Sequence, residues 1–516
     1  MVKKLLDIGI CIVYIIYTMS FVRKIKRGDK TYLAEVENQW MGGRCVQKHI
    51  RYIGKEVDDK VILASSISNL EVTEIKLFGP LLVLDSLAKE IDLEAMLGEY
   101  GTEIMSMVYA HCLDFKSVNK MTQWYDRTDL PFILSHDALT KDRLYSALDS
   151  IENLQADYIQ RTIFEKVIDH YKLPVTGIVY DVTNTYLYGN KCPIGKLGHP
   201  KDGQPGRPLI QIGLAITKKE GIPICHKVLD GNVHDTRMFQ DFVTDFHRYK
   251  IKGGIFVYDR GISSAHNLMD IKALGWDTLC GLPIRGTLVE TVRNLKEKKI
   301  FVNIENRVQL KKNNFYVCSI PHTIDDLHGI LAVCFNSAQK HELQESRYDE
   351  IQNAKELLLQ KKTIKLGLEK YFDTNGEILS DVVAKAEEFD GFSCLFATKE
   401  LAKEEFIKLY FDKNIIERSF KTLKGIVSLQ PIRHWLYNRV TAHVFICYLS
   451  YLLLSLLEYH LRKIPMTAEE ALDELSSMYK VYLRDAKKNF QLSRVVTLTK
   501  KQELILKRVN KKLLKS

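Results

Sequence analysis

A stretch near the C-terminal end, FIKLYFDKNIIERSFKTLK at residues 406–424, combines residue types that can hold a metal ion and grip a phosphate. On a single helix, spacings of three, four and seven residues would put Tyr410, Lys413, Glu417 and Lys424 on one face. A helix that only packed into a core would carry leucines there. Because carboxylate oxygens suit hard cations and lysines attract phosphate, this face predicts metal-assisted chemistry on a phosphate.

Two more carboxylates stand in apolar runs that are expected to form buried strands. Asp181 lies within GIVYDVT, and Asp259 closes IFVYD. A carboxylate in such a run is costly unless a cation or a metal ion compensates its charge. Cleavage of a phosphodiester by two metal ions about 3.5–4 Å apart needs a few such groups. Asp181, Asp259 and Glu417 could supply them, although each acid alone also fits a turn or a helix cap.

The 406–424 stretch resembles the Y-x2-R-x3-E-x6-K signature of insertion-sequence transposases of the DDE class, in the IS-four-like family of bacteria and archaea. Tyr410, Glu417 and Lys424 match, and Lys413 stands where the family has Arg, which keeps the charge but loses bidentate geometry. Four further elements are similar to family motifs: GHPKD at 198–202, GNVHD at 231–235, VYDRG at 257–261 and LPIR at 282–285. The resemblance extends from residue 177 to about residue 457.

The resemblance implies a role for each matched residue. Asp181, Asp259 and Glu417 would hold two Mg²⁺ ions, for which Mn²⁺ could substitute. The expected contacts with DNA phosphates and bases come from Tyr410, Lys413, Lys424, Lys201, Arg260 and Arg285. The implied activity is binding of the terminal inverted repeats of an insertion sequence, followed by DNA cleavage and strand transfer. The implied partners are double-stranded DNA at the transposon ends and the target, with a homodimer on paired ends.

Three other functions remain open at this stage. A catalytically silent or domesticated descendant would only bind DNA, but retention of all three acids argues against it. A metal-dependent nuclease without strand transfer would use the same chemistry. A membrane-anchored protein is suggested by the apolar segments 8–22 and 443–457, but a comfortable span needs about 20 residues. We therefore expect no membrane, a buried helix at 443–457, and a cytoplasmic, nucleoid-associated protein.

The order of elements predicts an α/β fold. From residue 174 the pattern gives three strands, a helix, a strand, a helix and a strand, which fits a ribonuclease H-like mixed sheet with helices on its faces. We assign this catalytic domain to 173–460, with a β-rich and helical insertion at about 284–390. A β-hairpin region at 19–60 and a helical, DNA-binding domain at 70–172 precede it. Residues 1–18 are interpreted as an over-extended N-terminus.

The charge and the cysteine content of the chain indicate which partners and which metal sites to expect. The net charge of the chain is +10, and residues 480–516 alone contain twelve Lys or Arg and two Asp or Glu. We interpret 461–516 as a basic helical segment, either a DNA contact or a solvated tail. The ten cysteines form no Cys-x2-Cys pair. A zinc ribbon is therefore not expected, and the cysteines fit buried thiols in a reducing compartment.

Overall fold

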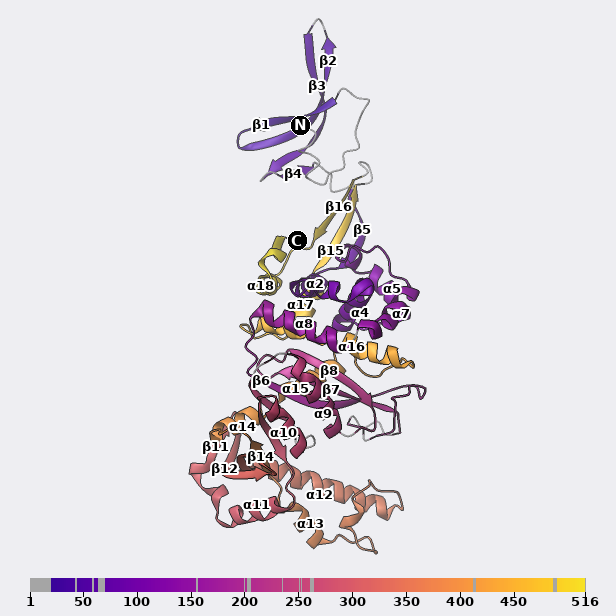
Figure 1. Cartoon of the computed structure of the whole chain (residues 1–516). Coiled ribbons are helices and arrows are strands. Elements are labelled where there is room, and N and C mark those ends of the chain that lie inside the picture. Colours follow the sequence, from indigo (N-terminus) through magenta and orange to yellow (C-terminus); the bar gives the residue numbers. More distant parts are fainter. Residues whose placement is uncertain are drawn as a thin grey trace. The chain divides into compact units, whose positions relative to one another are not determined.

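The computed structural model (Figure 1) describes the ranges 20–41, 44–57, 60–63, 70–154, 156–198, 200–201, 206–233, 235–249, 253–259, 264–411, 414–485 and 490–515, together with residue 251. The chain divides into two compact units. One consists of Met1–Ile75 with Lys480–Val496, and the other of Lys76–Tyr479 with Thr497–Ser516. The predicted over-extended N-terminus, 1–18, lies outside the described residues.

A four-stranded antiparallel sheet forms the N-terminal part of the smaller unit. Its order is β1 (Ser20–Arg27), β2 (Lys30–Met41), β3 (Arg44–Val57) and β4 (Lys60–Leu63). The sequence predicted a β-hairpin region at 19–60, with two strands. That prediction is wrong because the chain also reverses between β1 and β2, at Gly28. The positive φ of +60° at this glycine suits a tight turn.

A three-stranded sheet in the same unit joins distant parts of the chain. It has the order β16 (Phe490–Val495), β15 (Tyr479–Asp485) and β5 (Leu70–Leu77). The predictions of helix for residues 70–77 and for all of 461–516 are therefore wrong. The β-branched and aromatic residues of YKVYLRD and LEVTEIKL favour strands despite their charged neighbours. Helices remain at α17 (Ala468–Ser476) and α18 (Lys500–Val509).

The first part of the larger unit is helical from residue 79 onward, as predicted. Pro80 lies in the first turn of the first helix, where a missing N–H costs nothing. Thr140 caps a later helix by accepting a hydrogen bond from the Arg143 N–H. The helices are α2 (Gly79–Glu90), α3 (Leu93–Met96), α4 (Gly101–Leu113), α5 (Val118–Asp126), α6 (Leu130–Ile133), α7 (Lys141–Ser150) and α8 (Ala156–Tyr171).

A nine-stranded mixed sheet forms the core of the larger unit. Three antiparallel strands, β6, β7 and β8, lie at one edge, and β9 and β10 continue the sheet parallel to β6. The spatial order β8-β7-β6-β9-β10 confirms the predicted ribonuclease H-like core. These strands are β6 (Gly177–Tyr186), β7 (Leu209–Thr217), β8 (Pro223–Asp230), β9 (Ile255–Tyr258) and β10 (Asp277–Leu282).

The segment predicted as an insertion extends the same sheet. β14 (Phe392–Ala397) pairs with β10, and β13 (Leu327–Phe335), β12 (Asn313–Ile324) and β11 (Arg307–Leu310) follow outward. All of these pairs are antiparallel. The helices of this segment are α11 (Thr287–Glu297), α12 (Ser337–Leu359) and α13 (Ser380–Glu387). The β-rich and helical composition is as predicted, but the strands add to the core sheet.

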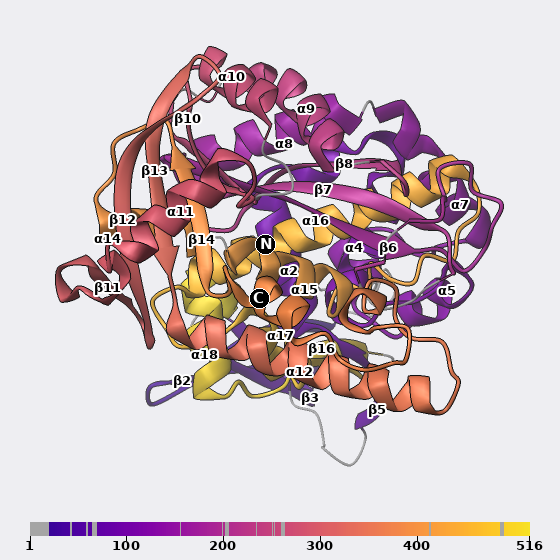
Figure 2. The ribbon, with the colours of Figure 1, turned by 90° about the horizontal axis from the view of Figure 1, so that it is seen from below.

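Helices cover both faces of the sheet at β6 and β9 (Figure 2). α9 (Asp235–Phe246) packs its Phe239 against Tyr180 and Tyr258, and α10 (Ala265–Ala273) packs against α9. α15 (Asn414–Lys424) packs against β6, and α14 (Lys403–Phe411) against β9 and β10. Because alternate strand residues face opposite sides, the neighbours of Tyr180 and Tyr258 face away from α9.

α16 (Tyr437–Leu461) is a long apolar helix that packs against α4, α15 and β8. Among the described residues, it is the one helix that is long and apolar enough to cross a membrane. However, 94% of its most apolar window is buried inside the protein. The prediction of a buried core helix at 443–457 is therefore confirmed.

Candidate active site

Asp181 lies in β6, and Asp259 directly follows β9, the adjacent parallel strand, so the two predicted catalytic aspartates come about level with each other. β6 and β9 pair Val179 with Val257, and two further steps along each chain reach Asp181 and Asp259. Neighbouring strands are about 4.8 Å apart, and residues at the same level point to the same face. Tyr180 and Tyr258 contact Phe239 of α9. The two aspartates therefore lie on the opposite face, where α14 and α15 pack.

The predicted helix at 406–424 is described in two parts, α14 up to Phe411 and α15 from Asn414, and residues 412–413 between them lie outside the described residues. All described residues of the stretch are helical, and the prediction of a single helix stays a prediction. Tyr410 lies in α14 and Glu417 in α15. The Tyr410 side chain is buried, with 8% of its surface exposed, and its hydroxyl donates to Asp259 Oδ1 at 2.9 Å.

Glu417 lies on the exposed side of α15, and Lys424 lies seven residues further on in the same helix. Seven residues are close to two helical turns, so these two side chains share a face as predicted. Ile416, Ser419 and Phe420 form the buried side.

Of the other predicted DNA-contacting residues, the structure describes Lys201 and Arg285. Lys201 is held against β6 beside Asp181, because its Nζ donates to the Val182 carbonyl at 2.6 Å and its backbone N–H to Asn184 Oδ1 at 3.0 Å. Arg285 is exposed and follows β10, whose C-terminal end lies at the same sheet edge as Asp259. Lys413 and Arg260 lie outside the described residues. All six contacts with DNA remain predictions.

The carboxylates fit hard divalent cations. Asp181 and Asp259 face the same side of the sheet, and α15, which carries Glu417, packs on β6. Oxygen donors of this kind are the ligands that Mg²⁺ and Mn²⁺ take, usually alongside water and substrate phosphate. The hydrogen bond from Tyr410 fixes one carboxylate oxygen of Asp259, as outer-shell partners do at metal sites. The donor set is therefore suitable for metal-assisted phosphodiester chemistry.

Two glycines of the recognised motifs pack against each other next to this site. A Cβ atom on Gly198 would lie 2.4 Å from the Gly231 carbonyl oxygen, and one on Gly231 would lie 2.0 Å from the Leu209 carbonyl oxygen. The Gly231 N–H donates to the Ile194 carbonyl at 3.1 Å. Both positions therefore exclude a side chain, which gives the glycines of GHPKD and GNVHD a physical explanation.

Sequence reasoning missed a cluster of exposed aromatic and basic side chains, which we call the aromatic–basic cluster. Its guanidinium and ammonium groups lie over ring faces: Arg207 over Tyr188 at 4.8 Å, Arg433 over Tyr188 at 5.4 Å, and Lys191 over Trp435 at 5.5 Å. Tyr188 is 54% exposed and Trp435 58% exposed. Short patterns such as YLY and RHW hint at it, but three separate segments have to meet to form it.

The aromatic–basic cluster is connected to the catalytic residues through the backbone. The chain leaves β6, which contains Asp181, and pairs Leu187 with Ile432 in the loop that follows α15. On the other side of this loop, Arg439 of α16 makes a bidentate hydrogen bond to Asp149, at 2.7 and 2.8 Å. The Arg439 guanidinium lowers the pKa of Asp149 below its usual value. The segment that presents Trp435 is thus anchored at both ends.

A sheet of this order, with two level aspartates and a glutamate-bearing helix on one face, defines a ribonuclease H-like protein built for phosphodiester chemistry. The family model for the transposase DDE domain matches residues 175–453, more than half of the chain. The chain therefore belongs to the DDE transposase family. Members of this family are transposition enzymes that generally depend on divalent metal ions.

One solved structure similar to this chain is the cryo-EM structure of a piggyBac transposase synaptic complex with hairpin DNA. The TM-score is 0.38 at 10% sequence identity, and the match covers 77% of this chain and 79% of that chain. No curated protein matches the chain.

We expect Tyr410→Phe to lower kcat for strand cleavage by about 10- to 100-fold, the usual effect of losing an outer-shell partner at a metal site. The variant removes the hydroxyl that holds Asp259 while keeping the ring packed. Half-maximal activity should then need more Mg²⁺, whereas DNA affinity should change little. A metal-concentration series on wild type and variant checks this. An unchanged metal dependence with weakened DNA binding would instead make Tyr410 a DNA contact.

Proposed function

We propose that this chain is the transposase of an insertion sequence of the IS-four-like group, which binds the terminal inverted repeats, cleaves DNA and transfers strands to a target. The observation that supports this most directly is the level placement of Asp181 and Asp259 on adjacent strands. Glu417 follows on a helix that packs on the same strand. Assembly as a homodimer on paired DNA ends, in the cytoplasm with the nucleoid, belongs to the same proposal.

In this mechanism, Asp181, Asp259 and Glu417 would hold two Mg²⁺ ions, and the chemistry supplied by such ions when bound would be activation of the attacking water or 3′-hydroxyl and stabilisation of the leaving oxygen. The protein's own part is positioning. Tyr410 keeps the Asp259 carboxylate in one orientation through its 2.9 Å hydrogen bond. Lys424, two turns along the same helix face as Glu417, attracts the phosphate next to the scissile bond. Lys201, held at Val182, adds positive charge beside Asp181.

The aromatic–basic cluster extends the proposed DNA path. Tyr186 and Tyr188 follow Asp181 by five and seven residues on one extended chain, which corresponds to roughly 17–23 Å at 3.3 Å per residue. Bases along one DNA strand are about 3.4 Å apart. A DNA strand that ran over the protein surface from the carboxylates to the cluster would therefore span about five to seven nucleotides. Arginines that stack on rings and keep free N–H groups suit such a phosphate contact.

Arg207→Gln combined with Arg433→Gln should flatten the salt dependence of DNA binding. Each neutralised phosphate contact lowers the slope of log K against log salt by about 0.9, so we expect a change of roughly 1.8. Fluorescence anisotropy with end DNA over a series of salt concentrations measures it. Arg293→Gln, which removes a charge on α11 that is paired with Glu388 at the end of α13, serves as control. An unchanged salt slope in the double variant would show that the cluster does not contact DNA phosphates.

The proposed function is tested by cleavage and joining assays with labelled DNA that carries the ends of the chain's own genetic locus. The purified protein should cut at these ends with Mg²⁺ or Mn²⁺, stop when a chelator is added, and join the cut ends to a second DNA. DNA with scrambled ends is the control. Cleavage without joining would identify the protein as a nuclease without strand transfer. Binding without cleavage would identify it as a catalytically silent DNA-binding descendant.

A further inference from the structure

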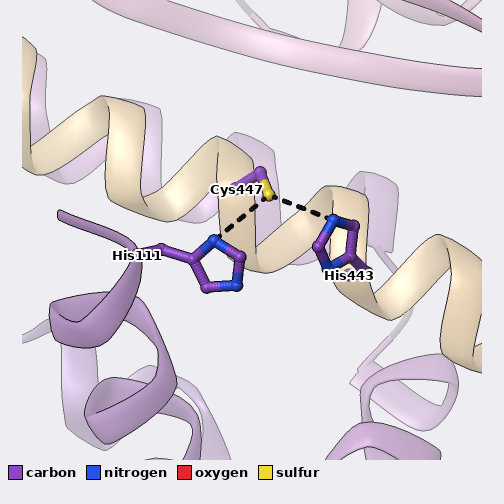
Figure 3. A group of neighbouring side chains, drawn as sticks. All are labelled: His111, His443 and Cys447. Atoms are coloured by element: carbon purple, nitrogen blue, oxygen red, sulfur yellow. Dashed lines mark hydrogen bonds between the residues drawn. The ribbon is translucent and has the colours of Figure 1, made fainter. Parts of the chain in front are cut away.

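Three metal-ligand side chains meet in the interior of the larger unit, apart from the carboxylates of the active site (Figure 3). His111 comes from the last turn of α4, and His443 and Cys447 lie one turn apart on α16. All three are buried, and their nearest donor atoms lie within 4.8 Å of one another. Among the described residues, this is the group of three such side chains that lies close enough to share one ion.

The spacing of the donor atoms matches a tetrahedral site for a borderline-soft cation. Cys447 Sγ lies 3.7 Å from His111 Nδ1 and 3.7 Å from His443 Nε2. Bond lengths of about 2.05 Å to nitrogen and 2.3 Å to sulfur at a tetrahedral angle require an N···S distance of about 3.6 Å. Two ligands one helical turn apart on α16 and a third from another helix also fit the usual construction of zinc sites.

We propose that His111, His443 and Cys447 bind a zinc-class transition-metal ion that ties α4 to α16. The ligand set of two imidazoles and one thiolate favours Zn²⁺ or Co²⁺ over Mg²⁺, which prefers oxygen. His434 is a candidate for a fourth ligand, with its ring centroid 6.0 Å from that of His443. This proposal is independent of the transposition mechanism, because none of these residues is among the catalytic carboxylates.

Two of the proposed ligand nitrogens face backbone carbonyl groups, which a bound ion would replace as their partners. His111 Nδ1 lies 2.5 Å from the Val427 carbonyl oxygen, and His443 Nε2 lies 3.1 Å from the Leu429 carbonyl oxygen, so each nitrogen carries a proton that a carbonyl accepts. On binding, each imidazole stays neutral by keeping its proton on the other ring nitrogen. The Cys447 thiol loses its proton to solvent, and its sulfur forms the bond to the metal.

The test uses the full chain, stripped of metal with a chelator and then titrated with Co²⁺ and Zn²⁺. The wild type should bind about one ion per chain, show the thiolate-to-cobalt charge-transfer absorption, and unfold at a higher temperature when Zn²⁺ is present. Cys447→Ser should lose both the absorption and the thermal shift. Cys394→Ser, which removes a different buried thiol, should keep them.

Absence of the charge-transfer absorption in the wild type, or no thermal shift with Zn²⁺, overturns the proposal without relying on any variant. An absorption that persists in Cys447→Ser also overturns it, because another cysteine would then be the ligand. If Cys447→Ser does not fold, His443→Gln replaces it, with loss of the thermal shift as the expected result.

Discussion

Asp259→Asn is expected to lower the rate of strand cleavage by a thousandfold or more, on the order of 4 kcal/mol of transition-state stabilisation. The substitution keeps the size of the side chain and its hydrogen bond with Tyr410, but it removes the charge that would hold a divalent ion. Asp181→Asn and Glu417→Gln should have effects of the same order, since all three acids belong to one proposed metal-binding set. Removing acids that act together should be far from additive.

The same variants should keep their affinity for DNA ends. Lys201 and the aromatic–basic cluster are untouched by these substitutions. Removing one carboxylate also lowers the repulsion that phosphate meets at the site. Cleavage assays and anisotropy measurements on the same preparations separate the two effects. Asp241→Asn, at an exposed position of α9 on the far face of the sheet, is the matched control and should cleave at the wild-type rate.

A reduction of less than about tenfold in either aspartate variant would contradict the assignment, because losing a metal ligand costs more than losing an outer-shell partner. Parallel loss of cleavage and DNA binding would point to misfolding, which circular dichroism would detect. Loss of cleavage with retained binding, restricted to the three acids, is the pattern that two-metal chemistry requires.

Local sequence patterns were sufficient to predict the strands and helices of the core sheet. The runs around Asp181 and Asp259 are β-branched and aromatic, and helical segments separate the later strands. Such elements are set by local periodicity and burial, so their order and type could be predicted. The level placement of the two aspartates then follows from parallel pairing of β6 and β9.

Features that depend on contacts between distant segments could not be predicted in this way. The aromatic–basic cluster needs Tyr188, Arg207 and Trp435 to meet. The donor atoms of His111 and Cys447 come together across 336 residues. Short local patterns do not reveal that these segments meet, and the absence of any Cys-x2-Cys pair excluded only a zinc ribbon. A buried site with ligands from two distant helices is found only once the helices are packed.

Gly231→Ala is expected to destabilise the larger unit by about 4 kcal/mol or more, which is exceptional for a single methyl group. The new Cβ would lie 2.0 Å from the Leu209 carbonyl oxygen and 2.8 Å from the Lys196 carbonyl oxygen. Both are backbone atoms, and Lys196 and Leu209 also hydrogen-bond to each other, at 3.0 and 2.8 Å. Relief of the clash must therefore shift the start of β7, which pairs at Leu209 with Tyr186 at the end of β6.

Thermal unfolding of the purified variant, compared with wild type, measures the effect, and the cleavage assay should fall with it. Gly206→Ala is the matched control, because a Cβ there meets nothing within 4 Å and adds only the strain of a φ of +80°. That strain should cost about 1–2 kcal/mol. If the Gly231→Ala protein were no less stable than Gly206→Ala, then β7 and the Lys196 segment could separate at little cost in free energy. The glycine of GNVHD would then need another explanation than close backbone packing.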